Sequence, residues 1–80
     1  MDKQEVENKV LECFAITYNK DVGTLKRETL ISEELSSKSI FMVSLVALVE
    51  NKLDILVSLQ VASKMKTIGD MVDKVYEMMG

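Results

Sequence analysis

The sequence predicts an all-α protein, a bundle of three longer helices and one short helix with a long first loop. The 80 residues contain no proline and only three glycines, the two residue types that most oppose a helix interior. Apolar residues recur at three- and four-residue spacing in separate segments, which is the period of an amphipathic helix. Eighty residues are too few for two hydrophobic cores, so residues 1–80 are expected to form one domain.

The first helix is predicted from Asp2 to about Tyr18. One apolar stripe runs along it, with charged residues mostly opposite. Its members are Val6, Val10, Cys13, Phe14 and Thr17. Cys13 lies in this stripe, so it is expected to be a small buried hydrophobe and not a reactive thiol. Gly23 is expected to supply the left-handed turn that ends the helix.

A connection of about fifteen residues is predicted from Thr24 to Lys38, with one helical turn around Arg27 to Leu30. Such a length is unusual for a loop without structure, so apolar side chains are expected to hold it on the bundle. These are Leu25, Leu30, Ile31 and Leu35.

The second helix is predicted from Ser39 to Leu53, with Ser39 at its N-cap, where a hydroxyl can accept a bond from an unpaired backbone N–H. At about 100° per residue, two faces separate. The expected core face is Met42, Leu45, Val46, Val49 and Leu53. The expected outer face is Ile40, Val43, Ser44, Ala47, Glu50 and Asn51.

A turn or extended link is predicted from Asp54 to Ser58, followed by a short helix from Gln60 to Lys64. Leu59, Val61 and Ala62 are its expected buried contacts. Thr67 and Asp70 form a capping-box pattern at the start of the last helix, with Asp in place of the usual Glu. The apolar stripe of that helix is Ile68, Met71, Val72, Val75, Tyr76 and Met79.

Composition excludes several classes of function. The net charge is −3 and the pI about 4.9, so there is no basic footprint for nucleic acid. There is no histidine and one cysteine, which argues against a zinc site and against histidine-based catalysis, and the chain is not expected to be an enzyme. The longest apolar stretch, Phe41 to Val49, is too short to span a bilayer, and the polar N-terminus does not resemble a signal peptide. A monomer in the cytoplasm is therefore expected.

Lys38-Ser39-Ile40, followed by the predicted helix, resembles the Asp-Ser-Leu modification site of the acyl carrier protein family. Three flanking segments also resemble that family, and the similarity is clearest from about Leu30 to Val75. They are Leu30-Ile31-Ser32-Glu33-Glu34-Leu35 before the site, Leu53-Asp54-Ile55-Leu56-Val57 after the second helix, and Lys66-Thr67-Ile68-Gly69-Asp70-Met71-Val72 at the start of the last helix.

The resemblance implies a four-helix bundle of acyl-carrier type in which Ser39 carries 4′-phosphopantetheine. A phosphopantetheinyl transferase, with coenzyme A and magnesium, would attach the arm to the Ser39 oxygen and release adenosine bisphosphate. The thiol of the arm would then hold an acyl intermediate as a thioester in fatty-acid, polyketide or related biosynthesis, and an apolar space between helices would shelter the acyl chain. Partner enzymes would contact the second helix. The residues implied are Ile40, Phe41, Val43, Ser44, Ala47 and Leu48.

Two departures from the family pattern leave alternatives open. Lys38 stands where the motif has an acid, which would slow modification or require a dedicated transferase. Phe41 and Ser44 stand where the second helix often carries acids, so Phe41 is a candidate apolar anchor for partners. The cargo is open between acyl, aryl and aminoacyl groups. The alternative function is a non-enzymatic helical adaptor, or a carrier relative that is not modified, with Ser39 only a helix cap.

Overall fold

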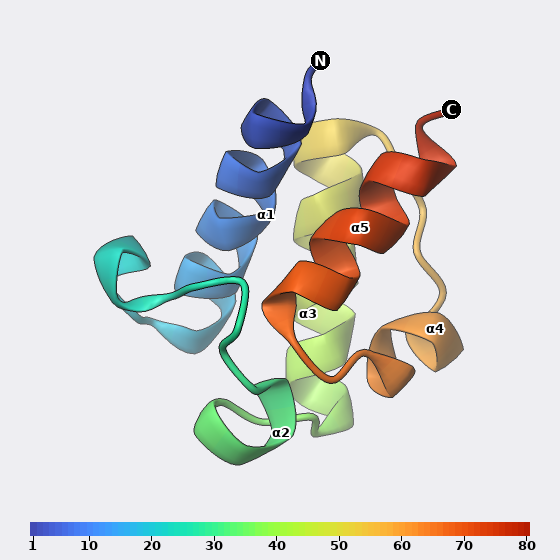
Figure 1. Cartoon of the computed structure of the whole chain (residues 1–80). Helices are drawn as coiled ribbons and strands as arrows, with labels where there is room; N and C mark the ends of the chain where they lie inside the picture. The colour runs from blue at the N-terminus through green and yellow to red at the C-terminus, as the bar shows by residue number, and fades with distance from the viewer.

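The computed structural model describes residues 1–80, and it is all-α, as the sequence predicts (Figure 1). It has five α-helices and one 3₁₀ turn, with two short helices where one was expected. The elements are α1 (Lys3–Tyr18), η1 (Val22–Thr24), α2 (Ile31–Glu34), α3 (Ser39–Leu53), α4 (Leu59–Lys64) and α5 (Ile68–Met78). The predicted bounds of the second helix are confirmed, and those of the first helix and of the short helix α4 each differ from prediction by one residue.

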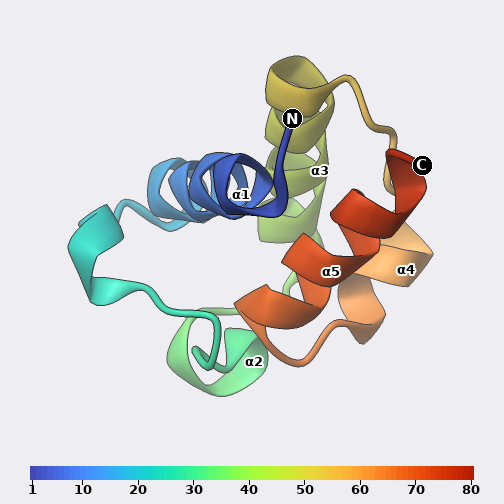
Figure 2. The same cartoon turned by 45° about the horizontal axis from the view of Figure 1, so that its top comes forward.

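The core lies among the three longer helices. Helix α1 packs against both α3 and α5, and α4 packs against α3 (Figures 1 and 2). Both chain termini lie at the same end of the molecule, and α2 lies at the opposite end. The buried apolar cluster is Val6, Val10, Cys13, Phe14, Leu25, Ile31, Met42, Leu45, Val49, Leu53, Val57, Ala62, Ile68, Met71, Val72 and Val75.

Some residues predicted to be in the core lie at its edge. Leu35, Val46 and Val61 are half-buried, and Leu59 is exposed. Tyr76 is 42% exposed, at the edge of the buried face of α5. The Lys3 ammonium lies 5.7 Å from the centre of its ring. A stripe drawn from spacing alone includes such border positions, since an apolar face of about 100° has residues at both edges that meet solvent.

Helix α1 ends at Tyr18, as predicted, but the left-handed residue that follows it is Asn19 and not Gly23. Asn19 has the left-handed φ of 54°, and its N–H bonds the carbonyls of Ala15 and Ile16. Asn tolerates this conformation because its short polar side chain can bond locally. Gly23 instead lies in η1, where the Asp21 carboxylate accepts from its N–H at 3.0 Å.

The long connection is held by backbone bonds to the start of α5. The N–H of Ile31 bonds the Lys66 carbonyl at 2.9 Å, and the N–H of Ile68 bonds the Thr29 carbonyl at 3.2 Å. A hydrogen-bonded turn lies at Arg27–Glu28, where the Thr29 N–H bonds the Lys26 carbonyl at 3.1 Å, but the helix of this connection is α2, which begins after Leu30 pairs with Thr67. Leu30, expected to be pinned inward, is 40% exposed there, whereas Leu25 and Ile31 are buried.

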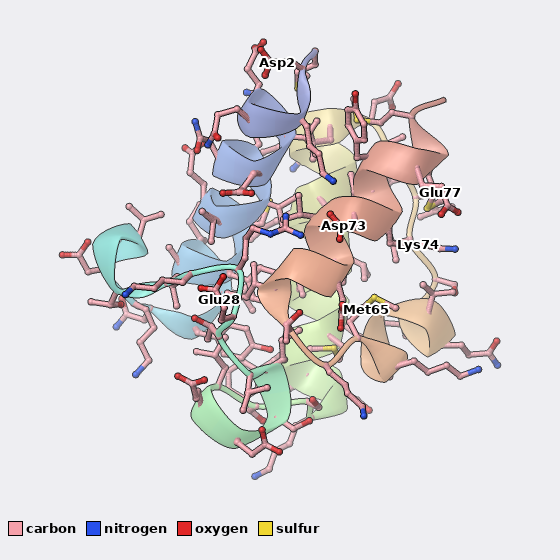
Figure 3. All side chains as sticks on the ribbon, in the orientation of Figure 1. Asp2, Glu28, Met65, Asp73, Lys74 and Glu77 are labelled. Carbon is pink, nitrogen blue, oxygen red and sulfur yellow. The ribbon has the colours of Figure 1, made fainter.

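Arg27 ties the same connection to two helices. Its guanidinium pairs with Glu7 of α1 at 3.2 Å and with Asp73 of α5 at 3.0 Å. Figure 3 labels Asp73 on α5, and Lys3 also reaches it at 3.0 Å. Bonds from Lys3 and Arg27 lower the pKa of Asp73. Gly69 permits this approach, because a Cβ there would lie 3.1 Å from the Arg27 carbonyl oxygen.

The two valines on the inner side of α3 should differ in their effect on stability. Val49 is 0% exposed, whereas Val46 is only half-buried. We expect Val49→Ala to lower the free energy of unfolding by about 1–3 kcal/mol, since it removes apolar contacts and leaves a cavity. Val46→Ala should cost clearly less. Urea denaturation of both variants measures the difference, and equal losses would contradict the observed burial.

Candidate functional site

Ser39 is the first residue of α3, and its side chain is exposed. The N-cap is Lys38, whose carbonyl accepts from the N–H groups of Phe41 and Met42 at 3.0 and 3.1 Å. No side chain caps this helix, so the prediction that Ser39 is the cap is wrong. The N-cap is the last residue with extended backbone angles, and in this chain that residue is Lys38. Ser39 has helical backbone angles, so its hydroxyl lies one position beyond the place from which it could cap the helix. That hydroxyl has no hydrogen-bond partner in the protein.

The segment before Ser39 is fixed by short polar bonds. The N–H of Lys38 bonds the Ser36 hydroxyl at 3.2 Å, and the hydroxyls of Ser37 and Ser32 lie 2.7 Å apart. The Tyr18 hydroxyl donates to the Ser36 carbonyl. Ser36 and Ser37 thus stabilise the approach to the helix, and Ser39 is the only serine of this run with its hydroxyl free.

Three aromatic rings connect this segment to the core. Phe14 and Tyr18 stack one turn apart on α1 with ring centres 6.1 Å apart, and Tyr18 stacks on Phe41 of α3 at 4.9 Å. Phe41 is therefore half-buried, and less of its ring is free for a partner than the sequence suggested. Tyr18 did not figure among the candidate residues, although its four-residue spacing from Phe14 was a signal that the two rings share a face.

The outer face of α3 is largely apolar and largely exposed to solvent. Ile40 is 72% exposed and Val43 51% exposed, and Ser44 and Ala47 are also exposed, whereas Leu48 is half-buried. Residues 36–66, which include α3 and α4, carry four lysines and two carboxylates, a net charge of +2. The rest of the chain carries the acidic excess, with Glu33 and Glu34 of α2 the last acids before Ser39 and Glu50 the first acid after it.

The cavities of the molecule lie along the first connection and not between the longer helices. The largest, about 420 Å³, is lined by Leu30, Ser32, Glu33 and Lys66. The other two, about 280 and 150 Å³, are bordered by residues between Lys20 and Leu35. Inward side chains fill the space between the longer helices, so an apolar guest there requires the helices to separate.

Cys13 is buried as predicted, and burial raises its pKa to about 11. No three His, Cys, Asp or Glu side chains gather in a metal-binding arrangement, and no helix combines the length and apolarity needed to cross a membrane. Comparison with protein-family models and with curated proteins gave no match to this chain.

Proposed function

We propose that this chain is a carrier protein and that Ser39 carries a 4′-phosphopantetheine arm. The observation that supports this most is the free, exposed hydroxyl of Ser39 at the N-terminus of a fifteen-residue helix. An attached phosphate would lie next to backbone N–H groups that lack partners within the helix, and next to the positive end of the helix dipole. The resemblance of residues 30–75 to the acyl carrier protein family points to the same residue.

The residues around Ser39 are compatible with the arm. The Ser39 oxygen would form the phosphodiester, and Lys38, the preceding residue, adds a positive charge near the phosphate. When attached, the arm supplies a thiol that holds an acyl group as a thioester. The chain itself catalyses nothing in this proposal: it presents Ser39 on a rigid helix end and offers a docking face to the enzymes that act on the cargo.

That docking face is the outer side of α3. Its exposed apolar residues Ile40 and Val43 lie one and four positions after Ser39 on the same helix. An enzyme that binds at Ser39 would therefore also contact them. Exposed apolar surface of this kind marks protein interaction sites. The expected partners are a phosphopantetheinyl transferase and acyl-transferring or synthase enzymes, which would bind mainly by burial of apolar surface.

Incubation with coenzyme A, magnesium and a broad-specificity transferase tests the proposal. Intact mass spectrometry should show one added phosphopantetheine on wild type and none on Ser39→Ala. Ser37→Ala is the matched control, since Ser37 is the neighbouring serine with its hydroxyl bonded to Ser32, and it should be modified like wild type. Modification that persists in Ser39→Ala would show that another residue is the site.

An unmodified helical adaptor is the second candidate, and the observation that favours it is Lys38 in the place of an acid. The Lys38→Asp variant separates the cases. If both proteins gain the arm, the carrier proposal holds. If only Lys38→Asp gains it, the lysine blocks general transferases, and the natural chain is then either an adaptor or the substrate of a dedicated transferase. If neither gains it, the adaptor is favoured.

A further inference from the structure

Ser36 and Phe41, which lie before and after Ser39, are both contacted by one side chain of a different helix, Tyr18 of α1. Tyr18, at the end of α1, donates its hydroxyl hydrogen to the carbonyl of Ser36, three residues before Ser39. Its ring stacks at 4.9 Å, with a 21° interplanar angle, on Phe41, two residues after Ser39. The other side of the stack is Phe14, which is fully buried in the core.

From these contacts we propose that Tyr18 is a positioning residue that clamps the Ser36–Phe41 turn and thereby sets how well Ser39 is presented to a modifying enzyme. This inference rests on the proposed function for its consequence, but the clamp itself is a property of the unmodified chain. It differs from a general packing role because the Tyr18 hydroxyl bonds the chain before Ser39, whereas the Tyr18 ring packs on the chain after Ser39.

Local structure explains why the turn needs such a clamp. The N-terminus of α3 lacks a side-chain cap, the hydrogen bond that stabilises the first turn of many helices. Ser39 itself is exposed and makes no side-chain bond that would hold the first turn. The first turn is then expected to fray unless Phe41 is held from outside the helix. Near neutral pH the Tyr18 hydroxyl is protonated, as in any tyrosine, and can donate this bond; burial raises its pKa further.

Amide hydrogen exchange on the unmodified protein tests the clamp directly. In Tyr18→Phe the ring stack remains and the hydroxyl bond is lost, and in Tyr18→Leu both are lost. We expect the amides of Phe41 and Met42, which close the first turn of α3, to exchange at least threefold faster in Tyr18→Phe and faster still in Tyr18→Leu. Amides near the other end of α3, such as that of Leu53, should keep their rates in Tyr18→Phe.

Tyr76→Phe is the matched control, because it removes the only other tyrosine hydroxyl, on an exposed side chain of α5. It should leave all these rates unchanged. Equal acceleration at both ends of α3 in Tyr18→Phe would show ordinary destabilisation and overturn the clamp, as would unchanged rates throughout.

The transferase assay adds the second measurement. We expect Tyr18→Phe to lower kcat/KM for modification of Ser39 by about three- to tenfold and Tyr76→Phe to leave it unchanged. If Tyr18→Phe exchanges faster at the first turn but is modified at the wild-type rate, the consequence for Ser39 is wrong. If wild type is not modified at all, the proposed function fails, and the exchange data alone decide whether the clamp exists.

Discussion

Phe14→Ala should give the largest loss of stability of any substitution considered for this chain. Phe14 is 0% exposed and is among the largest fully buried side chains. Truncation of such a residue costs about 3–5 kcal/mol, through lost transfer free energy and the cavity that remains. The total stability of a small domain is about 5–15 kcal/mol, so this variant is expected to be partly unfolded at the low end of that range. Chemical denaturation followed by far-UV circular dichroism measures the loss.

The neighbouring Ile16 provides the control for that measurement. It lies on the same helix but is 58% exposed, so Ile16→Ala should change the free energy of unfolding by less than about 0.5 kcal/mol. Phe14→Ala also removes the support under the ring of Tyr18, so its loss should include disorder at the start of α3. A loss below about 1 kcal/mol for Phe14→Ala would contradict the packing described for the core.

Helices with strong periodicity were predictable from the sequence, and the connection between them was not. In α3 the buried residues Met42, Leu45, Val49 and Leu53 recur at three- and four-residue spacing, and the serines before the apolar run marked its start, although the outer face is apolar too. The capping box of Thr67 and Asp70 is present as predicted, since both of its bonds lie within four residues. By contrast, α2 forms where the backbone of Ile31 meets that of Lys66, a contact between residues far apart in sequence. Local spacing carries no information about such a partner.

The candidate site was predictable in the same partial way. The position of Ser39 at the start of α3 follows from the pattern of hydroxyl and apolar residues around it. The N-cap was predicted at Ser39 and lies at Lys38, one residue earlier, which is the usual uncertainty of a helix end. Tyr18 and Phe41 meet only because α1 and α3 pack together, so the clamp on the turn could not be read from either segment alone.

Docking through α3 predicts a large effect of charge placed on its outer face. Ile40→Asp combined with Val43→Asp should reduce kcat/KM for modification by the transferase at least about tenfold, because two exposed apolar contacts next to Ser39 would become charged and resist desolvation. Both side chains are more than half exposed, so the unfolding midpoint should stay near that of wild type. Phe41→Ala is a poorer probe, since it also removes the stack on Tyr18.

Salt dependence and a charge-only control complete the test of docking. Association by apolar burial should change only modestly between about 0.05 and 0.5 M salt, because screening acts on exposed charges. Glu50 is the one acid on the outer face of α3, and Glu50→Gln should leave kcat/KM near the wild-type value at both salt concentrations. One combined result would show that partners recognise this chain by its acidic charge. In that result binding weakens steeply with salt, is lost in Glu50→Gln and is unaffected in the Ile40/Val43 double variant.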